Sequence, residues 1–344
     1  MKIGIITFHW AANYGGVLQA YALQKYLSDC GHDVEILDYK PSLYDYSPLK
    51  YLIRPQLLLH FRSEFNLYRK ELRLREFREK HLKLSKRYKK LSQLKNATLG
   101  YDVLISGSDQ VLNPSFLLRG EIRPTTAYFL DFGDAPNKIG YAVSFGCTQY
   151  PENASSLARK AVANFTKIGV RENSGIDILK DLNYKGNVIV VPDPTILIGK
   201  RLFQDIHLIK PQKEDYYCVY VLRKEIRCDF KNVVYMDEAH NPPSMEEWIG
   251  TIAFSKGLIT NSYHGMIMAI LHHVPFVSIM EVNKGSGMND RFLTLLSKLE
   301  LEKQIVNEGD DYASVLNQNI DWEVVDMKIE EFRSYGRNFL SFNY

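Results

Sequence analysis

The sequence predicts an α/β protein with two domains, each built around a parallel sheet. Short apolar, β-branched runs alternate with helical patterns along most of the chain, and this strand–helix–strand order implies parallel strands with right-handed crossovers. The chain has 344 residues, which is long for one domain and fits two of ordinary size. Polar residues follow several of the apolar runs directly, where ligands bind in open α/β sheets.

The first domain is expected over residues 1–198. Its predicted strands are 3–7, 33–37, 102–105, 138–144, 167–170 and 188–191. A loop through 13–16 is expected after the first strand, and a helix over 17–28 should follow it. Gly31 then lies where a helix C-cap is expected.

The second domain is expected over residues 199–325, after a linking segment at 199–215. Its strands are predicted at 216–222, 232–236 and 258–260. Ser244 and Glu247 have the spacing of a capping box, so a helix should begin there and end before Gly257. Residues 326–344 are predicted to form a C-terminal helix that packs back on the first domain.

A basic helical insertion is predicted over about residues 54–95 of the first domain. From 54 to 90 there are thirteen Arg and Lys against four Glu, an excess of nine, so the rest of this +3 chain carries −6. One helix face is predicted to carry Phe61, Phe65, Tyr68 and Leu72. Two interpretations stay open: a solvated insertion, or a surface for anionic lipid or a phosphorylated carrier.

Composition excludes several classes of protein. Hydrophobic residues are 45% and charged residues 24%, as in globular proteins, and a net charge of +3 argues against a nucleic-acid partner. The four scattered cysteines have neither zinc-ligand nor disulfide-framework spacing. No stretch approaches the roughly 18–20 apolar residues of a membrane span, and the N-terminus predicts a strand rather than a signal peptide. We expect a cytoplasmic protein, with contact at the inner face of the membrane left open.

The known cofactor motifs are missing from the sequence. The glycines after the first strand do not form the GxGxxG dinucleotide fingerprint, and no Walker A, HExxH or GxSxG pattern occurs. We therefore expect no cofactor and no metal.

The polar joint NSYHG, Asn261 to Gly265, lies between a predicted strand and a predicted helix. A helix N-terminus offers free N–H groups and partial positive charge, and Gly265 lets a ligand approach the backbone. His264 could transfer a proton or hold a phosphate there, or it could be a packed imidazole. Both interpretations stay open on the residues alone.

Two further strand ends carry candidate residues. Arg171 follows the strand 167–170, where its guanidinium suits a carboxylate or phosphate, or an ion pair with Glu172. Asp109 is either a carboxylate base or a helix cap. The remaining candidates, expected to line the cleft on the acceptor side, are Asn13, Tyr14, Gly15, Gln110 and Asn113.

Several motifs, taken in order, resemble the polysaccharide pyruvyl transferase family. They are ITFHWAANYGGVLQAYAL near the N-terminus, SGSDQVLNP at 106–114, VRENSG at 170–175, PDPT at 192–195, ITNSYHG at 259–265, and NDRFLTLLSKLEL, which contains Arg291. Each motif alone has low specificity, but their shared order over nearly the whole chain is specific.

The resemblance implies two Rossmann-like domains facing a cleft, as in GT-B glycosyltransferases. It also implies transfer of a pyruvyl group from phosphoenolpyruvate to a sugar of a cell-surface polysaccharide or its lipid-linked precursor, forming a ketal without a metal. The family's catalytic histidine then corresponds to His264, and its donor-binding arginine to Arg171. Ser262 stands where some branches carry a second arginine. Either another cation, Arg291 or Lys284, supplies that charge beside the helix-end residue Gly265, or the donor is a different one.

Two alternatives belong to other functional classes. The same fold serves glycosyltransferases that use a nucleotide sugar, for which Glu281 is the candidate ribose-binding carboxylate. A non-catalytic scaffold could instead bind glycan or membrane through the basic insertion.

Overall fold

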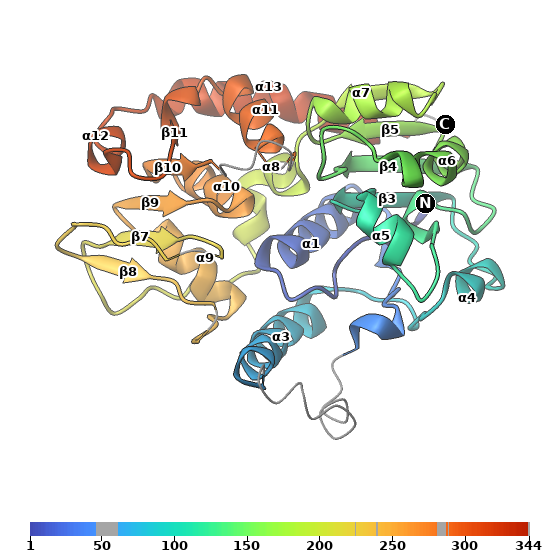
Figure 1. Ribbon diagram of the computed structural model, residues 1–344, viewed down its shortest axis with the longest axis horizontal. Helices are drawn as coiled ribbons and strands as arrows, with labels where there is room; N and C mark the ends of the chain where they lie inside the picture. Colours follow the sequence, from blue (N-terminus) through green and yellow to red (C-terminus); the bar gives the residue numbers. More distant parts are fainter. Residues whose placement is uncertain (46–60, 224, 239, 281–286, 288, 343–344) are drawn as a thin grey trace.

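Two parallel sheets form the framework of the molecule. The computed structural model describes residues 1–45, 61–223, 225–238, 240–280, 287 and 289–342, with the backbone alone for 61–64. The first sheet has the strand order β2-β1-β3-β4-β5-β6 and the second β11-β10-β9-β7-β8. We refer to the part of the chain built on each sheet as the first and the second lobe (Figure 1). The predicted α/β class is confirmed.

The strands are short and mostly buried. Those of the first lobe are β1 (Lys2–Ile6), β2 (Asp33–Ile36), β3 (Val103–Asp109), β4 (Asn137–Val143), β5 (Lys167–Val170) and β6 (Asn187–Val190). Those of the second lobe are β7 (Tyr217–Tyr220), β8 (Val233–Tyr235), β9 (Gly257–Thr260), β10 (Phe276–Ile279) and β11 (Ile305–Val306). Every pairing in both sheets is parallel, as near-continuous apolar runs predict for sheets covered on both faces.

The helices connect and cover these strands. They are α1 (Tyr14–Asp29), α3 (Phe61–His81), α4 (Leu91–Lys95), α5 (Pro114–Arg119), α6 (Glu152–Ala161), α7 (Ser174–Asp181), α8 (Pro194–Ile198), α9 (Met245–Ala253), α10 (Tyr263–Leu271), α11 (Asp290–Lys298), α12 (Tyr312–Leu316) and α13 (Trp322–Leu340). Short 3₁₀ turns include η1 (Ser42–Tyr44) and η5 (Gly199–Phe203). In the described residues, no helix combines the length and apolar character that crossing a membrane requires.

Helix α1 is buried almost along its whole length because it lies between the lobes. It contacts α3 and α8, and it also contacts α10 of the second lobe. The loop predicted at 13–16 is wrong beyond its first residue, since the helix begins at Tyr14. The reason is a cap: the Asn13 side chain accepts a hydrogen bond of 2.9 Å from the Gly16 amide.

Helix α3 packs with a different face from the one predicted. Phe65 and Tyr68 are 50% and 40% exposed, whereas Leu74 and Phe77 are buried. The buried face also carries three charged residues that find partners there. Lys70 pairs with Glu238 of the second lobe at 2.6 Å, and Arg78 pairs with Glu71 within the helix. The buried face therefore combines Leu74 and Phe77 with ion-paired charged residues, and the predicted apolar stripe did not identify it.

Helix α13 runs along the top of the molecule from the second lobe to the first (Figure 1). The Arg333 side chain donates to the carbonyl of Ile196 at 2.6 Å, and Lys167 of β5 donates to the carbonyl of Phe339. The α13 residue Gly336 lies where an added Cβ would be 2.7 Å from the Tyr141 hydroxyl, so the helix sits close against the first sheet. The domain limits at 198 and 325 stay predictions.

Candidate functional site

The carboxyl ends of β3, β5 and β6 meet around one buried guanidinium, that of Arg171. Its Nη1 is 3.2 Å from Asp193 Oδ2 and its Nη2 is 3.3 Å from Asp109 Oδ1. Its Nε is 3.7 Å from Glu172 Oε2, so the ion pair with Glu172 coexists with the others. Because parallel strands end at the same edge of a sheet, three segments distant in sequence supply this cluster.

The charges in the cluster shift one another's proton affinities. Burial alone would lower the pKa of Arg171, but Asp109, Glu172 and Asp193 raise it above its usual value. Burial alone would raise the pKa of Asp193, but His264 and Arg171 hold it well below its usual range. For Glu172, burial outweighs Arg171 and raises the pKa. The buried cluster therefore holds Arg171 and Asp193 in their charged forms and shifts Glu172 toward its neutral form.

Asp193 is the residue that connects the two lobes chemically. It caps α8 through Oδ1, which accepts a hydrogen bond of 3.0 Å from the Thr195 amide. Its Oδ2 lies 3.4 Å from His264 Nε2 of the second lobe. The sequence analysis did not select Asp193 as a site residue, although the PDPT motif after β6 contains it. An aspartate at the end of a buried strand is the signal that could have found it.

The His264 imidazole lies in the contact between the lobes. The residue is 6% exposed, and Nε2 has no hydrogen-bond partner among the described residues. The ring packs against α1 where Gly15 has no side chain, since a Cβ there would lie 2.0 Å from His264 Nδ1. Gly15 is thus required by this close approach. A buried imidazole beside a carboxylate has the geometry of a proton-transfer group held in one orientation.

The Tyr263 ring separates two arginines. The guanidinium carbon of Arg171 is 5.0 Å from its centroid, and that of Arg291 is 5.2 Å away. Arg291 Nε is buried without a hydrogen-bond partner in the described part of the chain, and burial lowers the pKa of Arg291 with a further contribution from Arg171. The structure therefore brings Arg291, on α11, to the cluster as a second cation. Lys284 and Glu281 lie outside the described residues.

The polar residues before His264 build the turn that presents it. Asn261 brackets the backbone of Leu222, accepting from its amide at 2.7 Å and donating to its carbonyl at 3.0 Å. Ser262 caps α10 and accepts a hydrogen bond of 3.2 Å from the Gly265 amide. The amide of Gly265 is therefore already engaged by Ser262, and these polar groups hold the strand-to-helix turn.

The remaining predicted cleft residues separate into two groups. Asn113 caps α5 by accepting from the Ser115 amide at 2.9 Å and donates to Gln110 at 3.3 Å, so this pair borders the cluster on β3. Tyr14 is buried instead, with its hydroxyl donating to the Pro243 carbonyl at 2.6 Å. Its ring stacks on Trp248 at 5.3 Å. The structure thus places Tyr14 in the packing between the lobes.

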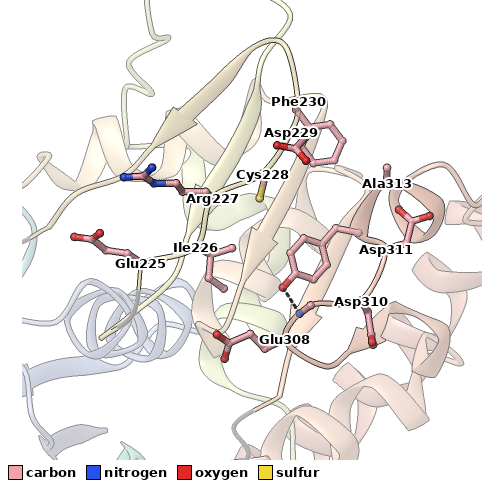
Figure 2. Close-up of a pocket in the computed structure, with 12 residues that line it drawn as sticks. Glu225, Ile226, Arg227, Cys228, Asp229, Phe230, Glu308, Asp310, Asp311 and Ala313 are labelled. Atoms are coloured by element: carbon pink, nitrogen blue, oxygen red, sulfur yellow. Dashed lines mark hydrogen bonds between the residues drawn. The ribbon is translucent and has the colours of Figure 1, made fainter.

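A separate cavity of about 580 Å³ lies elsewhere on the second lobe, between the loop that follows β7 and the loop before α12 (Figure 2). It is open and acidic, and it contains none of the predicted site residues. The carboxylates that line it are Glu225, Asp229, Glu308, Asp310 and Asp311. An anionic ligand would be repelled there, so we place the functional site at the Arg171 cluster.

Comparison with known proteins identifies the family. The family model described as polysaccharide pyruvyl transferase matches residues 13–281, which include Asp109, Arg171, Asp193 and His264. The chain belongs to this family. The resemblance read from the motifs is confirmed, and the protein is a transferase at the level of the family.

Similar solved structures come from sugar-modifying enzymes. The UDP-GlcNAc 2-epimerase of Methanocaldococcus jannaschii has a TM-score of 0.50 and 9% identity, covering 98% of this chain and 99% of that one. The epimerase of Neisseria meningitidis has a TM-score of 0.44 and 8% identity, covering 98% and 100%. The glycotransferase of kitacinnamycin has a TM-score of 0.43 and 11% identity, covering 97% of this chain and 95% of that one. The first supports the predicted pair of Rossmann-like domains, the GT-B arrangement. A search of curated proteins found no match.

Replacing Gly15 by alanine should disable the transferase through His264. The new Cβ would meet Nδ1 at 2.0 Å, so the ring or α1 must move, and a displacement near 1 Å can cost about 100-fold in rate. Turnover by the transferase should fall by that order. Gly16→Ala is the control, since its Cβ meets Asp109 Oδ2 at 3.4 Å, an ordinary contact. Equal activity of the two variants would contradict the close approach.

Replacing Asp193 by asparagine should change how stability depends on pH. The folded pKa of Asp193 is lowered, so its ionised form stabilises the fold above the unfolded pKa of about 3.9, and this is lost as pH falls through the folded value. At pH 7 the variant should lose about 1.5–3 kcal/mol, the worth of a charged hydrogen-bond partner. Urea unfolding at decreasing pH should show that the difference in unfolding free energy between the variant and wild type becomes smaller below pH 4. A constant difference would exclude titration of Asp193 as its cause.

Proposed function

We propose that this transferase moves a pyruvyl group from phosphoenolpyruvate to two hydroxyl groups of a sugar, forming a ketal. The sugar belongs to a cell-surface polysaccharide or its lipid-linked precursor. One observation carries the proposal: Arg171 and Arg291 both lie close to the Tyr263 ring beside His264, and Nε of Arg291 is buried without a hydrogen-bond partner among the described residues. Buried polar groups are normally satisfied, so this atom favours a polar ligand at this place.

The charge of the cluster supports an anionic donor. Arg171 is balanced by Asp109, Glu172 and Asp193, whereas Arg291, 5.2 Å from the Tyr263 centroid, brings a second guanidinium to the cluster. Phosphoenolpyruvate carries a phosphate and a carboxylate, and guanidinium groups match both in geometry. Arg291 takes the place of the arginine that some branches carry at the position of Ser262.

The proposed reaction balances as follows. Carbon C3 of the donor gains a proton, C2 forms bonds to two hydroxyl oxygens, and the C2–O bond to phosphate breaks. One hydroxyl proton ends on the new methyl group and the other on the released phosphate. His264 carries the proton to C3, with Asp193 at 3.4 Å stabilising the imidazolium. Asp109 is the base for the acceptor, because its side chain is 18% exposed while that of Asp193 is 0% exposed.

The test compares two donor classes on the purified protein. Phosphoenolpyruvate at about 100 times its dissociation constant should raise the unfolding free energy by about 2.7 kcal/mol, seen as a rise in melting temperature. A sugar with two neighbouring free hydroxyls should then release phosphate and gain a pyruvyl ketal detectable by mass spectrometry. Stabilisation by UDP-sugars, with none by phosphoenolpyruvate, would overturn the proposal in favour of a nucleotide-sugar glycosyltransferase.

A further inference from the structure

The loop after α5 exposes one apolar side chain almost completely. Ile122 is 94% exposed, the largest fraction for any large hydrophobic residue that the structure describes. Its neighbours Arg119 and Arg123 are also exposed. An isoleucine in water between two arginines contributes nothing to the core, and it becomes significant when further apolar and basic side chains gather around it.

The loop is held in place by a carboxylate that points into the protein. Glu121 Oε1 accepts hydrogen bonds from the Leu91 amide at 2.7 Å and the Thr125 hydroxyl at 3.3 Å, and it is also bound by the Tyr39 hydroxyl. The Glu121 carboxylate is therefore engaged by hydrogen bonds inside the protein, while the Ile122 side chain is exposed to solvent. A loop fixed in this way presents its apolar residue without the entropy loss of ordering a flexible one.

A second exposed apolar residue belongs to a segment that contacts the end of α5. Leu43, in η1, is 54% exposed, and its neighbour Tyr44 donates to the Arg119 carbonyl at 3.4 Å. Lys89 is 3.5 Å from Asp45, directly after η1, and Lys90 precedes the amide of Leu91 that Glu121 binds. We name this surface the basic apolar patch and define it by Leu43, Lys89, Lys90, Arg119, Ile122 and Arg123.

We propose that the basic apolar patch docks the transferase on an anionic lipid bilayer. Apolar side chains surrounded by Lys and Arg are the pattern of interfacial membrane binding, in which the first enter the headgroup region and the second attract anionic lipids. The charge is complementary, since the patch holds four cations and, with Lys89 paired to Asp45, keeps three in excess. Lys89 and Lys90 are the last two residues of the basic segment 54–90. Part of the positive charge that the sequence concentrates in that segment therefore lies in the patch.

The position of the patch suits a lipid-linked acceptor, and this part of the inference rests on the proposed function. The Tyr44 ring lies 4.7 Å from that of Trp10, which follows β1 at the carboxyl edge of the first sheet. Asp109 and Arg171 end β3 and β5 at the same edge. A bilayer against the patch would therefore hold a sugar on a lipid carrier near the carboxyl edge of the first sheet.

The test is co-sedimentation of the full chain with vesicles of phosphatidylcholine, with and without phosphatidylglycerol. Wild type should bind the anionic vesicles and be released by salt. Ile122→Ser should weaken binding about tenfold, within the range for burying an isoleucine. Arg119→Gln and Arg123→Gln should each weaken it about fivefold. Since no catalysis is involved, failure of the proposed reaction would leave this result unchanged.

Matched controls carry the same changes elsewhere. Met327→Ser removes an apolar side chain that is 65% exposed on α13, and Lys185→Gln with Lys303→Gln removes two exposed charges. Both controls should bind as wild type does. Equal binding to neutral and anionic vesicles, or patch variants that match the controls, would overturn the proposal. So would self-association that Ile122→Ser abolishes without any vesicle binding, which would make a second copy the partner.

Discussion

Replacing His264 by alanine should lower phosphate release from phosphoenolpyruvate by about 10²–10⁴-fold, the usual contribution of a positioned acid or base. The physical reason is its fixed place between the lobes. Nε2 lies 3.4 Å from Asp193 Oδ2, and Gly15 leaves the space that the ring occupies. No other histidine of the described chain is paired with a carboxylate of the Arg171 cluster.

The control for this variant is His240→Ala in the same lobe. The His240 side chain is 61% exposed and pairs with Asp237 at 2.6 Å, so its loss should leave turnover within a factor of about two, as for an exposed ion pair. Circular dichroism and a melting curve should show that both variants fold. If His264→Ala retained wild-type turnover, the proton-transfer role would have to be given to another residue, with Asp109 the first candidate.

Replacing Arg171 by methionine should destabilise the fold by about 3–5 kcal/mol, the cost of removing one partner from a buried ion pair. Three carboxylates, those of Asp109, Glu172 and Asp193, would lose their shared cation while staying largely out of water. Binding of phosphoenolpyruvate should be lost as well, since Arg291 would be the only guanidinium left at Tyr263. Urea unfolding and calorimetric titration measure the two effects separately.

Arg201→Met supplies the comparison for stability. Arg201 pairs with Asp29 at 3.7 Å, but its side chain is 50% exposed. The variant should therefore lose less than about 1 kcal/mol of unfolding free energy. Arg171→Lys tests the donor role with the charge kept, and the missing fork should weaken donor binding about tenfold to a hundredfold. Normal donor affinity in Arg171→Lys, together with lost acceptor binding, would reverse the assignment of the two halves of the cleft.

The Arg171 cluster was predictable in part because parallel strands place their carboxyl ends together. Arg171 and Asp109 were selected from their positions after strands, and they do meet, at 3.3 Å. The resemblance to the family added Arg291, which the structure places at Tyr263. Asp193 escaped notice because an aspartate before Pro-Thr is typical of a helix cap, a role it also has. Only its second oxygen, facing the other lobe, gives it a part in the site.

The residues between the lobes were the hardest to interpret from the chain alone. Tyr14 resembled a polar loop residue, yet its hydroxyl binds Pro243, more than two hundred positions away. Helix α3 showed an apolar stripe, yet its inward face pairs Lys70 with Glu238. In both cases the partner comes from the other lobe, and local periodicity carries no information about a surface that exists only after the lobes meet.

By itself the sequence determined the α/β class, the two parallel sheets and the family, because burial on both faces demands apolar strands and ligand-binding turns need particular polar residues at their ends. The tertiary structure alone decided which of those turns meet. It paired Asp193 with His264 across the lobes, set Gly15 beneath the imidazole, and turned Ile122 outward by anchoring Glu121. These contacts join residues far apart along the chain, and their energies depend on burial and distance, which exist only in the folded molecule.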